Sequence, residues 1–539
     1  MTLTPSTIRI GRRYRANRLD GAYDAIVIGS GIGGMTAAAC LAELGNKVLV
    51  LEQHYTAGGF THSYARNGYE WDVGVHYIGD VGAPHTLTRR LFDFVSNGGL
   101  KWAPMDDHFD RIFLGDESFD LVATPTKYRA ELLTHFPDDA AAIDEYLRRI
   151  ATAAGSMRLL TMEKLLPGPA AALVRKLRQW RAPAWLNQTT REVLESLTDN
   201  QKLIAVLTGQ WGDNGLPPAQ SSFIIHSLIA RHYLYGGYYP VGGASRMAET
   251  IIPQIQKNGG ELFTYASVEQ ILVEAGRAVG VRMADGSEIR SPVVISNAGV
   301  FNTFGKLLPE PVARKSGYLQ KLDTVKRSMA SLGMYIGLQD TAENLGLPKT
   351  NYWLYPSEDY EGSLDRFFAD PENQTIPLVY ISFPSAKDPD FLRKYPGRAT
   401  IEIVAPGPHD WFAQWADQPW GKRGEEYDAL KEKWSQRLLE RLYQHFPQLR
   451  GKIDYYELST PLSTDYFCRY ETGEIYGLDH DPSRFEQRWL KPKTDIPGLY
   501  LTGQDVVTCG VAGAMIGGLA TALVVSGRRG IGLGKRFLA

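Results

Sequence analysis

The sequence contains a glycine cluster, GSGIGG at residues 29–34, whose spacing suits the binding of a dinucleotide. Gly29, Gly31 and Gly34 match the pattern G-x-G-x-x-G. The first glycine of this pattern allows a tight turn, the second lets a pyrophosphate approach the backbone, and the third lets a helix pack closely on a strand. Glu52 follows about 20 residues later, where a carboxylate accepts hydrogen bonds from ribose hydroxyls. These residue types indicate redox chemistry carried by a bound dinucleotide.

Three predicted elements position these residues. Residues 24–28 are apolar and β-branched, which predicts a buried strand, and residues 35–44 are rich in Ala and Leu, which predicts a helix. Residues 48–51 predict a second strand, which ends at Glu52. In such a βαβ unit the phosphates face free N–H groups at the helix N-terminus, where the helix dipole favours negative charge. For the glycine cluster alone, an ordinary glycine-rich turn is the alternative.

Length and composition narrow the class of protein. A chain of 539 residues predicts two or three domains. The net charge of −2 gives no field that would favour nucleic acid, so no nucleic-acid partner is expected. The three cysteines, Cys40, Cys468 and Cys509, are far apart and indicate neither a disulfide framework nor a metal site. We therefore expect no metal and a reducing, cytoplasmic compartment.

The stretches that follow Glu52 do not continue as a nicotinamide-binding domain usually does, with another helix. A glycine pair, Gly58 and Gly59, instead leads into GVHYIG at residues 74–79. Four more stretches follow at long intervals: GGYYPVGGAS at 236–245, the strand-like SVEQILV at 267–273, ISNAG at 295–299 and GLYLTGQDVVTCGVAGA at 498–514.

In this order and spacing the stretches resemble those of the retinol saturase and carotenoid isomerase family, within the flavin amine oxidase and phytoene desaturase superfamily. The resemblance runs from about residue 12 to 527, and EQHYTAGG, GVHYIG and TGQDV point to its retinol saturase branch. It implies an α/β fold: a discontinuous Rossmann-type FAD-binding domain with an inserted α+β substrate domain. It also implies FAD as the cofactor.

The resemblance assigns roles to individual residues of the FAD site. The glycine cluster would hold the pyrophosphate, Glu52 the adenosine ribose, the backbone of Val268 the adenine and Asp505 the ribityl hydroxyls. A helix starting near Gly510 would direct N–H groups at the flavin ring. The full set of expected cofactor-binding residues is Gly29, Gly31, Gly33, Gly34, Glu52, Gln53, Gly58, Gly59, Val268, Asn297, Gly503, Asp505, Gly510, Val511 and Ala512.

Because the FAD motifs lie at the start, middle and end of the chain, the expected binding domain has two long insertions. Its parts are residues 20–85, 236–305 and 456–539. The insertions, 86–235 and 306–455, form the expected substrate domain. Helices are predicted at 140–152 and 221–235, strands at 328–337 and 400–404, and a charged helix at 427–446.

Three side chains are candidates for a catalytic role as proton donors: His76, Tyr77 and Tyr239. His76 and Tyr77 lie in the segment that in this superfamily passes near the flavin ring, and Tyr239 lies in a second such segment. Tyr466 and Tyr476 belong to a third. Packing or hydrogen bonding is the alternative role for each of them.

Several functions are compatible with these residues. The expected one is saturation of a carbon–carbon double bond in a hydrophobic polyene or lipid, retinoid- or carotenoid-like; isomerisation, desaturation or action on an unsaturated fatty acyl chain are alternatives. An amine oxidase-like enzyme would have a small wet pocket instead of a long apolar tunnel, and a non-enzymatic carrier would seal the flavin from substrate. Only one complete dinucleotide fingerprint is visible, so the reductant, NAD(P)H or a redox protein, stays open.

Residues 159–185 combine leucines and tryptophans with basic residues, a composition that suits a membrane interface. Pro167 and Pro169 prevent one continuous helix there. An arginine-rich stretch at residues 9–18 is either a solvated arm or a second contact with anionic lipid. No unbroken apolar run has the length of a membrane span. We therefore expect peripheral membrane association; a soluble surface helix is the alternative.

Overall fold

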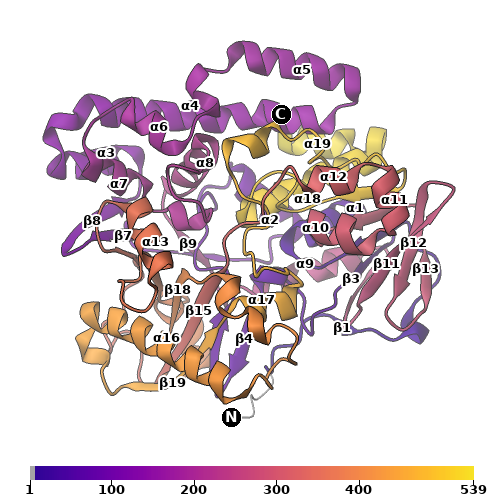
Figure 1. Ribbon diagram of the computed structural model, residues 1–539. Coiled ribbons are helices and arrows are strands. Elements are labelled where there is room, and N and C mark those ends of the chain that lie inside the picture. The colour runs from indigo at the N-terminus through magenta and orange to yellow at the C-terminus, as the bar shows by residue number, and fades with distance from the viewer. Residues whose placement is uncertain (1–5, 539) are drawn as a thin grey trace.

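In the computed structural model, which describes residues 6–538, the glycine cluster lies at the end of a six-stranded parallel sheet (Figure 1). The central strands are short runs of apolar residues that are buried on both faces, as is usual for parallel strands covered by helices. In spatial order the strands are β1 (Arg12–Arg13), β10 (Glu261–Thr264), β3 (Val48–Leu51), β2 (Ala25–Ile28), β14 (Val294–Ser296) and β20 (Leu499–Leu501). The sheet thus draws on the start, the middle and the end of the chain.

Helices α1 (Ile32–Glu43), α9 (Arg246–Gln256) and α18 (Gly510–Ser526) pack around this sheet, and α1 contacts both of the others. Small residues let α1 and α18 approach closely: a Cβ on Gly518 would run into the carbonyl oxygen of Gly33. The predicted strand–helix–strand unit is confirmed. The helix begins three residues earlier than predicted, because the second half of the glycine cluster forms its first turn.

A second, seven-stranded sheet occupies the lower left of Figure 1 and packs against α16 (Gly424–His445) and α13 (Tyr360–Ala369). The strands predicted at 328–337 and 400–404 and the helix predicted at 427–446 all belong to this unit. The sheet also takes two strands from the preceding insertion, because β7 pairs in parallel with β16. In spatial order the strands are β19 (Ile453–Ser459), β15 (Ser331–Leu338), β18 (Ala399–Pro406), β17 (Val379–Ser382), β16 (Asn351–Tyr355), β7 (His108–Leu114) and β8 (Glu117–Val122).

A layer of helices crosses the top of the molecule in Figure 1. Its longest member, α4 (Ala140–Leu165), packs on α8 (Phe223–Tyr233), and α5 (Gly168–Arg181) lies on the outer side of α4. The predicted break is confirmed: Leu166 and Pro167 separate α4 from α5, and Pro169 lies in the first turn of α5. The other helices of this layer are α3 (Pro125–His135), α6 (Thr190–Glu195) and α7 (Gln201–Thr208).

Small sheets and short helices connect these layers. β4 (Ser63–Arg66) pairs with β5 (Tyr69–Asp72), and β6 (Trp102–Pro104) pairs with β9 (Tyr238–Pro240). A three-stranded sheet contains β11 (Val268–Glu274), β12 (Arg277–Met283) and β13 (Glu288–Arg290). The remaining α-helices are α2 (Leu87–Val95), α10 (Val300–Asn302), α11 (Glu310–Lys315), α12 (Tyr318–Leu322), α14 (Pro384–Lys387), α15 (Phe391–Lys394), α17 (Pro461–Cys468) and α19 (Ile531–Leu538).

The arginine-rich stretch near the N-terminus is attached to the parallel sheet. Arg12 and Arg13 form β1 and pair with the end of β10, and Ile10 is buried. The guanidinium groups of Arg9 and Arg13 lie over the rings of Tyr55 and Tyr265. The stretch is thus docked along the edge of the sheet, although most of its arginine side chains are exposed.

One helical stretch among the described residues, 510–537, is long and apolar enough to cross a membrane, and half of its apolar 18-residue part is buried within the protein. Its first part is α18, which packs on α1 and whose N-terminus borders the cavity described below. At Gly527 the φ angle of +53° interrupts the α-helical geometry. These contacts account for the apolar composition of α18 as that of a core helix.

Candidate functional site

The glycine cluster forms a tight loop between β2 and α1. Gly29 has a φ of +93°, which favours glycine, and a Cβ on Gly34 would run into the carbonyl oxygen of Gly29. A Cβ on Gly31 would lie 2.8 Å from Nδ2 of Asn297, and one on Gly33 would lie 2.6 Å from Cα of Gly503. The glycines therefore leave backbone bare at the start of α1, the form a pyrophosphate cradle takes.

Glu52, at the end of β3, holds this loop against the next one. One carboxylate oxygen accepts hydrogen bonds from the amide (2.8 Å) and the hydroxyl (2.7 Å) of Ser30, and the other accepts one from the amide of His54 (2.8 Å). Glu52, its neighbour Gln53 and Val268, at the start of β11, line the large cavity that is described below. The residues expected at the adenosine end of the dinucleotide thus lie together.

The second glycine pair lies directly on the first cluster. Gly58 forms an isolated parallel bridge with Gly31, and a Cβ on Gly59 would lie 2.9 Å from Cα of Gly31. Both residues of the pair have positive φ angles, +125° and +57°. Glycine at 58 and 59 therefore permits a backbone-to-backbone contact that other residues would obstruct.

Asp505 and the start of α18 form the opposite end of the predicted cofactor site. One oxygen of Asp505 accepts a hydrogen bond from the amide of Val300 (2.8 Å), while Oδ1 is buried without a hydrogen-bond partner. Burial raises the pKa of this carboxyl, and the guanidinium of Arg484 opposes that rise. No side chain caps the N-terminus of α18, and Gly510, Val511 and Ala512 all border the cavity.

These features fit a dinucleotide with a long polar chain. Bare backbone is available for phosphates, a carboxylate is available at each end for hydroxyl groups, and uncapped amides stand where negative charge would be stabilised. Of the predicted cofactor-binding residues, Gly34 and Gly503 do not line the cavity; they allow α1 and the loop after β20 to pack closely. Among residues 6–538, no group of three His, Cys, Asp or Glu side chains is arranged to hold a metal ion.

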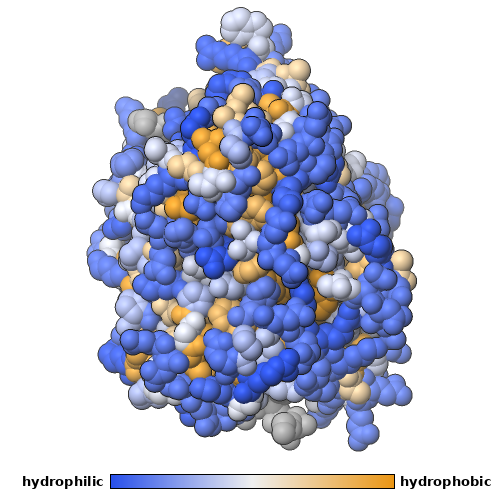
Figure 2. All heavy atoms as spheres, turned by 90° about the vertical axis from the view of Figure 1, so that its left-hand side faces the viewer, coloured by the Kyte–Doolittle hydropathy of each residue, from blue (hydrophilic) through white to orange (hydrophobic). Residues whose placement is uncertain are grey.

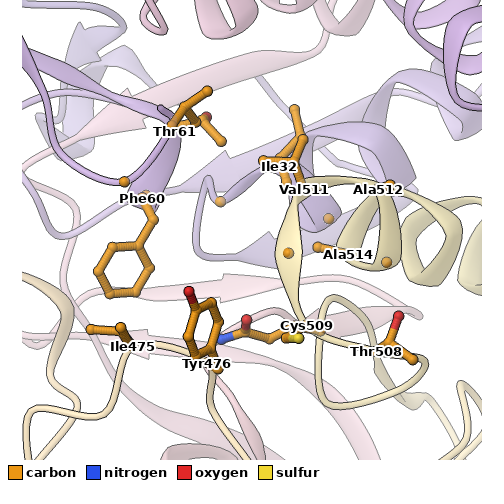
Figure 3. A pocket seen from close by; sticks show the side chains of 18 of the residues that line it. Ile32, Phe60, Thr61, Ile475, Tyr476, Thr508, Cys509, Val511, Ala512 and Ala514 are labelled. Atoms are coloured by element: carbon orange, nitrogen blue, oxygen red, sulfur yellow. The ribbon is translucent and has the colours of Figure 1, made fainter. Parts of the chain in front are cut away.

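A single cavity of about 1690 Å³ connects these motifs to the inserted layers. Figure 3 shows part of its wall, where Tyr476 and Cys509 lie near the start of α18 and Phe60 stands beside them. Beyond the cofactor motifs the lining is mainly apolar and aromatic. It includes Met157, Leu165, Ile225, Leu228, Ile229, Tyr233, Trp353, Leu378, Tyr380 and Tyr476.

His76 and Tyr77 line this cavity, and Tyr239 lies behind its wall. His76 Nδ1 lies 2.7 Å from an oxygen of buried Glu402. Burial lowers the pKa of His76 to about 3 and raises the pKa of Glu402 to about 8, so both groups are uncharged at neutral pH. The hydroxyl of Tyr239 donates a hydrogen bond to Asp72, whose pKa burial raises to about 7.

A buried lysine, Lys387, connects His76 to Asn351 through hydrogen bonds. Lys387, near the end of α14, donates hydrogen bonds to the carbonyl of His76 (3.0 Å), to Ser382 Oγ (2.7 Å) and to Asn351. Burial lowers the pKa of this ammonium group to about 7. The amide of Asn351 in turn donates to Asp110 (2.8 Å).

Sequence reasoning missed several residues of this wall: Asp213, Tyr233, Trp353 and Tyr380. None belongs to a glycine motif, and each is brought to the cavity by an inserted segment. The ring of Tyr233 stacks on that of Tyr77 at 4.1 Å, and Trp353 lies 4.5 Å from Tyr380, measured between ring centres. Only the density of aromatic residues in the insertions could have hinted at them.

Comparison with known proteins supports the fold. Residues 27–95 match the family described as NAD(P)-binding Rossmann-like domain. An oxidoreductase from Methanosarcina mazei superimposes with a TM-score of 0.61 at 18% identity, covering 92% of this chain and 99% of that one. A putrescine oxidase bound to putrescine also gives a TM-score of 0.61, at 14% identity, covering 94% of this chain and 100% of that one. The predicted α/β fold of the flavin amine oxidase type is confirmed.

Sequence relatives cover nearly the whole chain. The all-trans-retinol 13,14-reductase of Danio rerio is 36% identical over 533 residues, covering 96% of this chain and 88% of the relative. The human protein of the same name is 37% identical, covering 94% and 86%. The chloroplastic prolycopene isomerase of Arabidopsis thaliana is more distant, at 27% identity, covering 92% and 82%. The resemblance seen in the motifs is confirmed, and the chain belongs to the all-trans-retinol 13,14-reductase family.

Proposed function

We propose that this protein is an FAD-dependent oxidoreductase that saturates a carbon–carbon double bond of a long hydrophobic polyene, with retinoids as the substrate class. One observation carries the proposal: the cavity runs on from the cofactor motifs into a space lined by apolar and aromatic side chains. A cavity of about 1690 Å³ accommodates a dinucleotide together with an extended chain. The names of the relatives agree with this substrate class.

Different residues of the proposed site bind different parts of the dinucleotide. Backbone of the glycine cluster holds the pyrophosphate, Glu52 the adenosine ribose, Val268 the adenine and Asp505 the ribityl chain. When bound, the flavin supplies a hydride, that is, a proton with two electrons. The positive end of α18 stabilises negative charge near Gly510.

The protein orients its substrate by burial, because a hydrocarbon chain has almost no polar group to hold. Apolar surface removed from water contributes roughly 25 cal/mol per Å². Trp353, Tyr380 and Tyr233 give the wall an aromatic surface against which a conjugated chain can pack. The length of the cavity then fixes which double bond reaches the cofactor.

The substrate enters from a membrane surface, which the protein contacts peripherally from the cytoplasmic side. The cavity lining includes Met157, Met162 and Leu165 on α4 and Phe537 on α19. Over this end of the cavity lies what we call the α4–α5 patch: the exposed side chains of Met162, Leu166, Leu173, Leu177 and Trp180. In Figure 2 orange atoms lie among blue ones toward the top of the molecule, the level at which Figure 1 shows α4 and α5.

Isomerisation of a polyene is the second candidate, because relatives named prolycopene isomerase share most of the chain. Such a reaction leaves the mass of the substrate unchanged. Amine oxidation is disfavoured, because the large apolar cavity offers little to hold a small polar substrate. An external donor, NAD(P)H or a redox protein, reduces the flavin again after each turnover of the reductase.

The proposal is tested anaerobically with the FAD-loaded protein. The flavin is reduced chemically and mixed with retinol, a carotenoid or a polyunsaturated fatty acid, while flavin absorbance and lipid mass are followed. Reoxidation of the flavin with a gain of two hydrogens by the polyene is the expected result. An unchanged mass with altered geometry would identify an isomerase. Reaction with small amines alone would refute action on an alkene.

A further inference from the structure

A carboxylic acid outside the predicted site stands at the cavity wall. Asp213 ends the short 3-10 helix Trp211–Asp213 and lines the cavity. One of its oxygens lies 3.3 Å from the phenol oxygen of Tyr77. The same phenol oxygen lies 2.8 Å from Asp110 and 3.2 Å from the side-chain nitrogen of Gln210. The phenol oxygen of Tyr77 thus lies within hydrogen-bonding distance of two carboxyl groups and one amide.

Counting hydrogens assigns the protons in this cluster. A phenol has one hydrogen to donate and two lone pairs that accept. Asp110 also accepts hydrogen bonds from Gln210 (2.7 Å) and Asn351 (2.8 Å), so it is the acceptor of the phenol hydrogen. Gln210 donates to the phenol oxygen. The remaining contact, with Asp213, is a hydrogen bond only if the carboxyl of Asp213 carries a proton and donates it.

The surroundings of Asp213 keep that proton in place. Burial and the neighbouring charge of Asp110 raise the pKa of Asp213 well above its usual range. The nearest cation of the network, Lys387, lies 5.8 Å from the centre of the Tyr77 ring. The titratable groups that face Asp213 are Asp110, Cys509 and the phenols of Tyr77, Tyr233, Tyr355, Tyr380 and Tyr476.

Asp213 also lies beside the segment that leads into α18. Its carbonyl oxygen accepts a weak hydrogen bond from the thiol of Cys509 (3.8 Å), the residue just before Gly510. Figure 3 shows Cys509 and Tyr476 together at the cavity wall below the start of this helix. The acid is therefore next to the expected cofactor end of the cavity as well as to its aromatic part.

We propose that Asp213 is the proton donor of the reduction and that Tyr77 and Asp110 position it. The proposal rests on the function proposed above. Saturating a double bond breaks one π bond and forms two C–H bonds: one carbon receives the hydride with its electron pair, and the other receives a proton. The O–H bond of Asp213 breaks, its electron pair stays on oxygen, and the carboxylate is reprotonated from water after the product leaves.

Other groups at the wall are weaker acids or are already committed. Burial raises the pKa values of Tyr380 and Tyr476 well above 10, so at neutral pH they release a proton far less readily than a carboxylic acid. His76 is uncharged, and its Nδ1 is engaged with Glu402. A neutral carboxyl that lines the cavity is the acid best suited to donate.

The test compares the reduced, FAD-loaded wild type with Asp213→Asn in single turnovers with a polyene in H₂O and in D₂O. The variant keeps the size of the side chain and can still donate to Tyr77. We expect unchanged FAD content and substrate affinity, but a rate lower by about 100-fold or more, the usual contribution of a general acid. The wild-type rate should fall as pH rises through the pKa of Asp213, whereas that of the variant should not. Asp213→Glu should restore part of the rate.

Asp388→Asn is the matched control. This buried carboxyl is not part of the cavity lining, and one oxygen accepts both of its hydrogen bonds, from the amides of Gly242 and Asp390. An asparagine oxygen can accept them too, so the rate should stay at the wild-type value. A separate measurement needs no turnover: the infrared difference spectrum of wild type minus Asp213→Asn at neutral pH should show the band of one protonated carboxyl, because the bands of protonated Glu402 and Asp72 are common to both proteins and cancel.

The outcomes separate the two proposals. If the wild type saturates the polyene and Asp213→Asn matches its rate, the role of Asp213 is refuted and the function stands. If the difference spectrum lacks this band, the role of Asp213 is refuted as well. If the wild type saturates no polyene, the proposed function fails and the proton donor with it.

Discussion

Replacing Leu173 and Trp180 with glutamate should release the protein from anionic membranes. Both residues lie on α5, a helix with no buried residue, and they are 71% and 80% exposed. They are the most exposed members of the α4–α5 patch. Because neither side chain supports the core, their replacement should leave the fold intact.

The size of the effect follows from the exposed area. A tryptophan buries about 150–250 Å² when fully enclosed, and complete burial of a leucine contributes about 1.5–3 kcal/mol. We assume that the membrane interface covers about half of the exposed side-chain area of Leu173 and Trp180. At roughly 25 cal/mol per Å², the two residues together then contribute about 3 kcal/mol to the free energy of membrane binding. With about 1.4 kcal/mol per factor of ten, the partition coefficient should fall about 100-fold. The two added negative charges lower it further on anionic lipid.

The assay is flotation with vesicles that contain phosphatidylserine, at low and at high salt. The wild type should float at low salt and less at high salt, because exposed Lys176 and Arg181 are screened. Phe368→Glu with Leu392→Glu is the matched control. These residues are 40% and 46% exposed, lie outside the α4–α5 patch, and should not affect flotation.

Two results would refute this reasoning. One is a wild type that stays with the soluble fraction at low salt. The other is a Leu173→Glu/Trp180→Glu protein that floats as the wild type does, while the control variant does not float. That result would place the membrane contact on the face that contains Phe368 and Leu392. Unchanged thermal unfolding of both variants is required for either conclusion.

Gly33→Ala should abolish dinucleotide binding, because its Cβ would lie 2.6 Å from Cα of Gly503 and 2.9 Å from the carbonyl oxygen of Ala514. The flavin absorbance of the purified protein measures this loss. Gly155→Ala is the control, because its Cβ would meet no atom within 4 Å outside the adjacent part of its own helix. Glu52→Gln should lower both FAD occupancy and the unfolding temperature of FAD-free protein. The amide nitrogen that replaces one carboxylate oxygen cannot accept the hydrogen bonds made to that oxygen, those of Ser30 or that of His54. The loss is about 1.5–3 kcal/mol per charge-assisted bond. An unfolding temperature equal to that of the wild type would contradict this structural role. Val268→Ile should leave FAD affinity nearly unchanged in calorimetric titration, because the expected adenine contacts are made by backbone, and a large loss would argue for side-chain contact.

The sequence predicts the local units of the fold well. The strand at 48–51 is found at the predicted residues, and the predicted break occurs at Pro167, between α4 and α5. Such units are visible because apolar periodicity, glycine and proline act over a few neighbouring residues. The N-terminal strand β1 is the exception: it consists of two exposed arginines, which carry no apolar signal of pairing with β10.

Placement of distant segments could not be predicted in the same way. The pairing of β7 with β16 joins residues about 240 positions apart. The contacts among Tyr77, Asp110 and Asp213 likewise bridge separate segments. A buried aspartate looks in sequence like any surface aspartate, so its role emerges only when the desolvated surroundings are known. Cofactor residues could be assigned because the resemblance supplied the long-range arrangement that the residues alone did not.

The parallel sheet also determines when, during synthesis, the protein can first hold its cofactor. β2 and β3 leave the ribosome early, but β14, the second neighbour of β2, follows only at Val294, and β20 at Leu499. At about 5–20 residues per second, roughly 20–90 s separate β3 from β20. During this interval the growing chain exposes apolar strands with unpaired edges, which are prone to association. Any chain that ends before α18 lacks one end of the proposed cofactor site, so we expect a shortened product to be inactive.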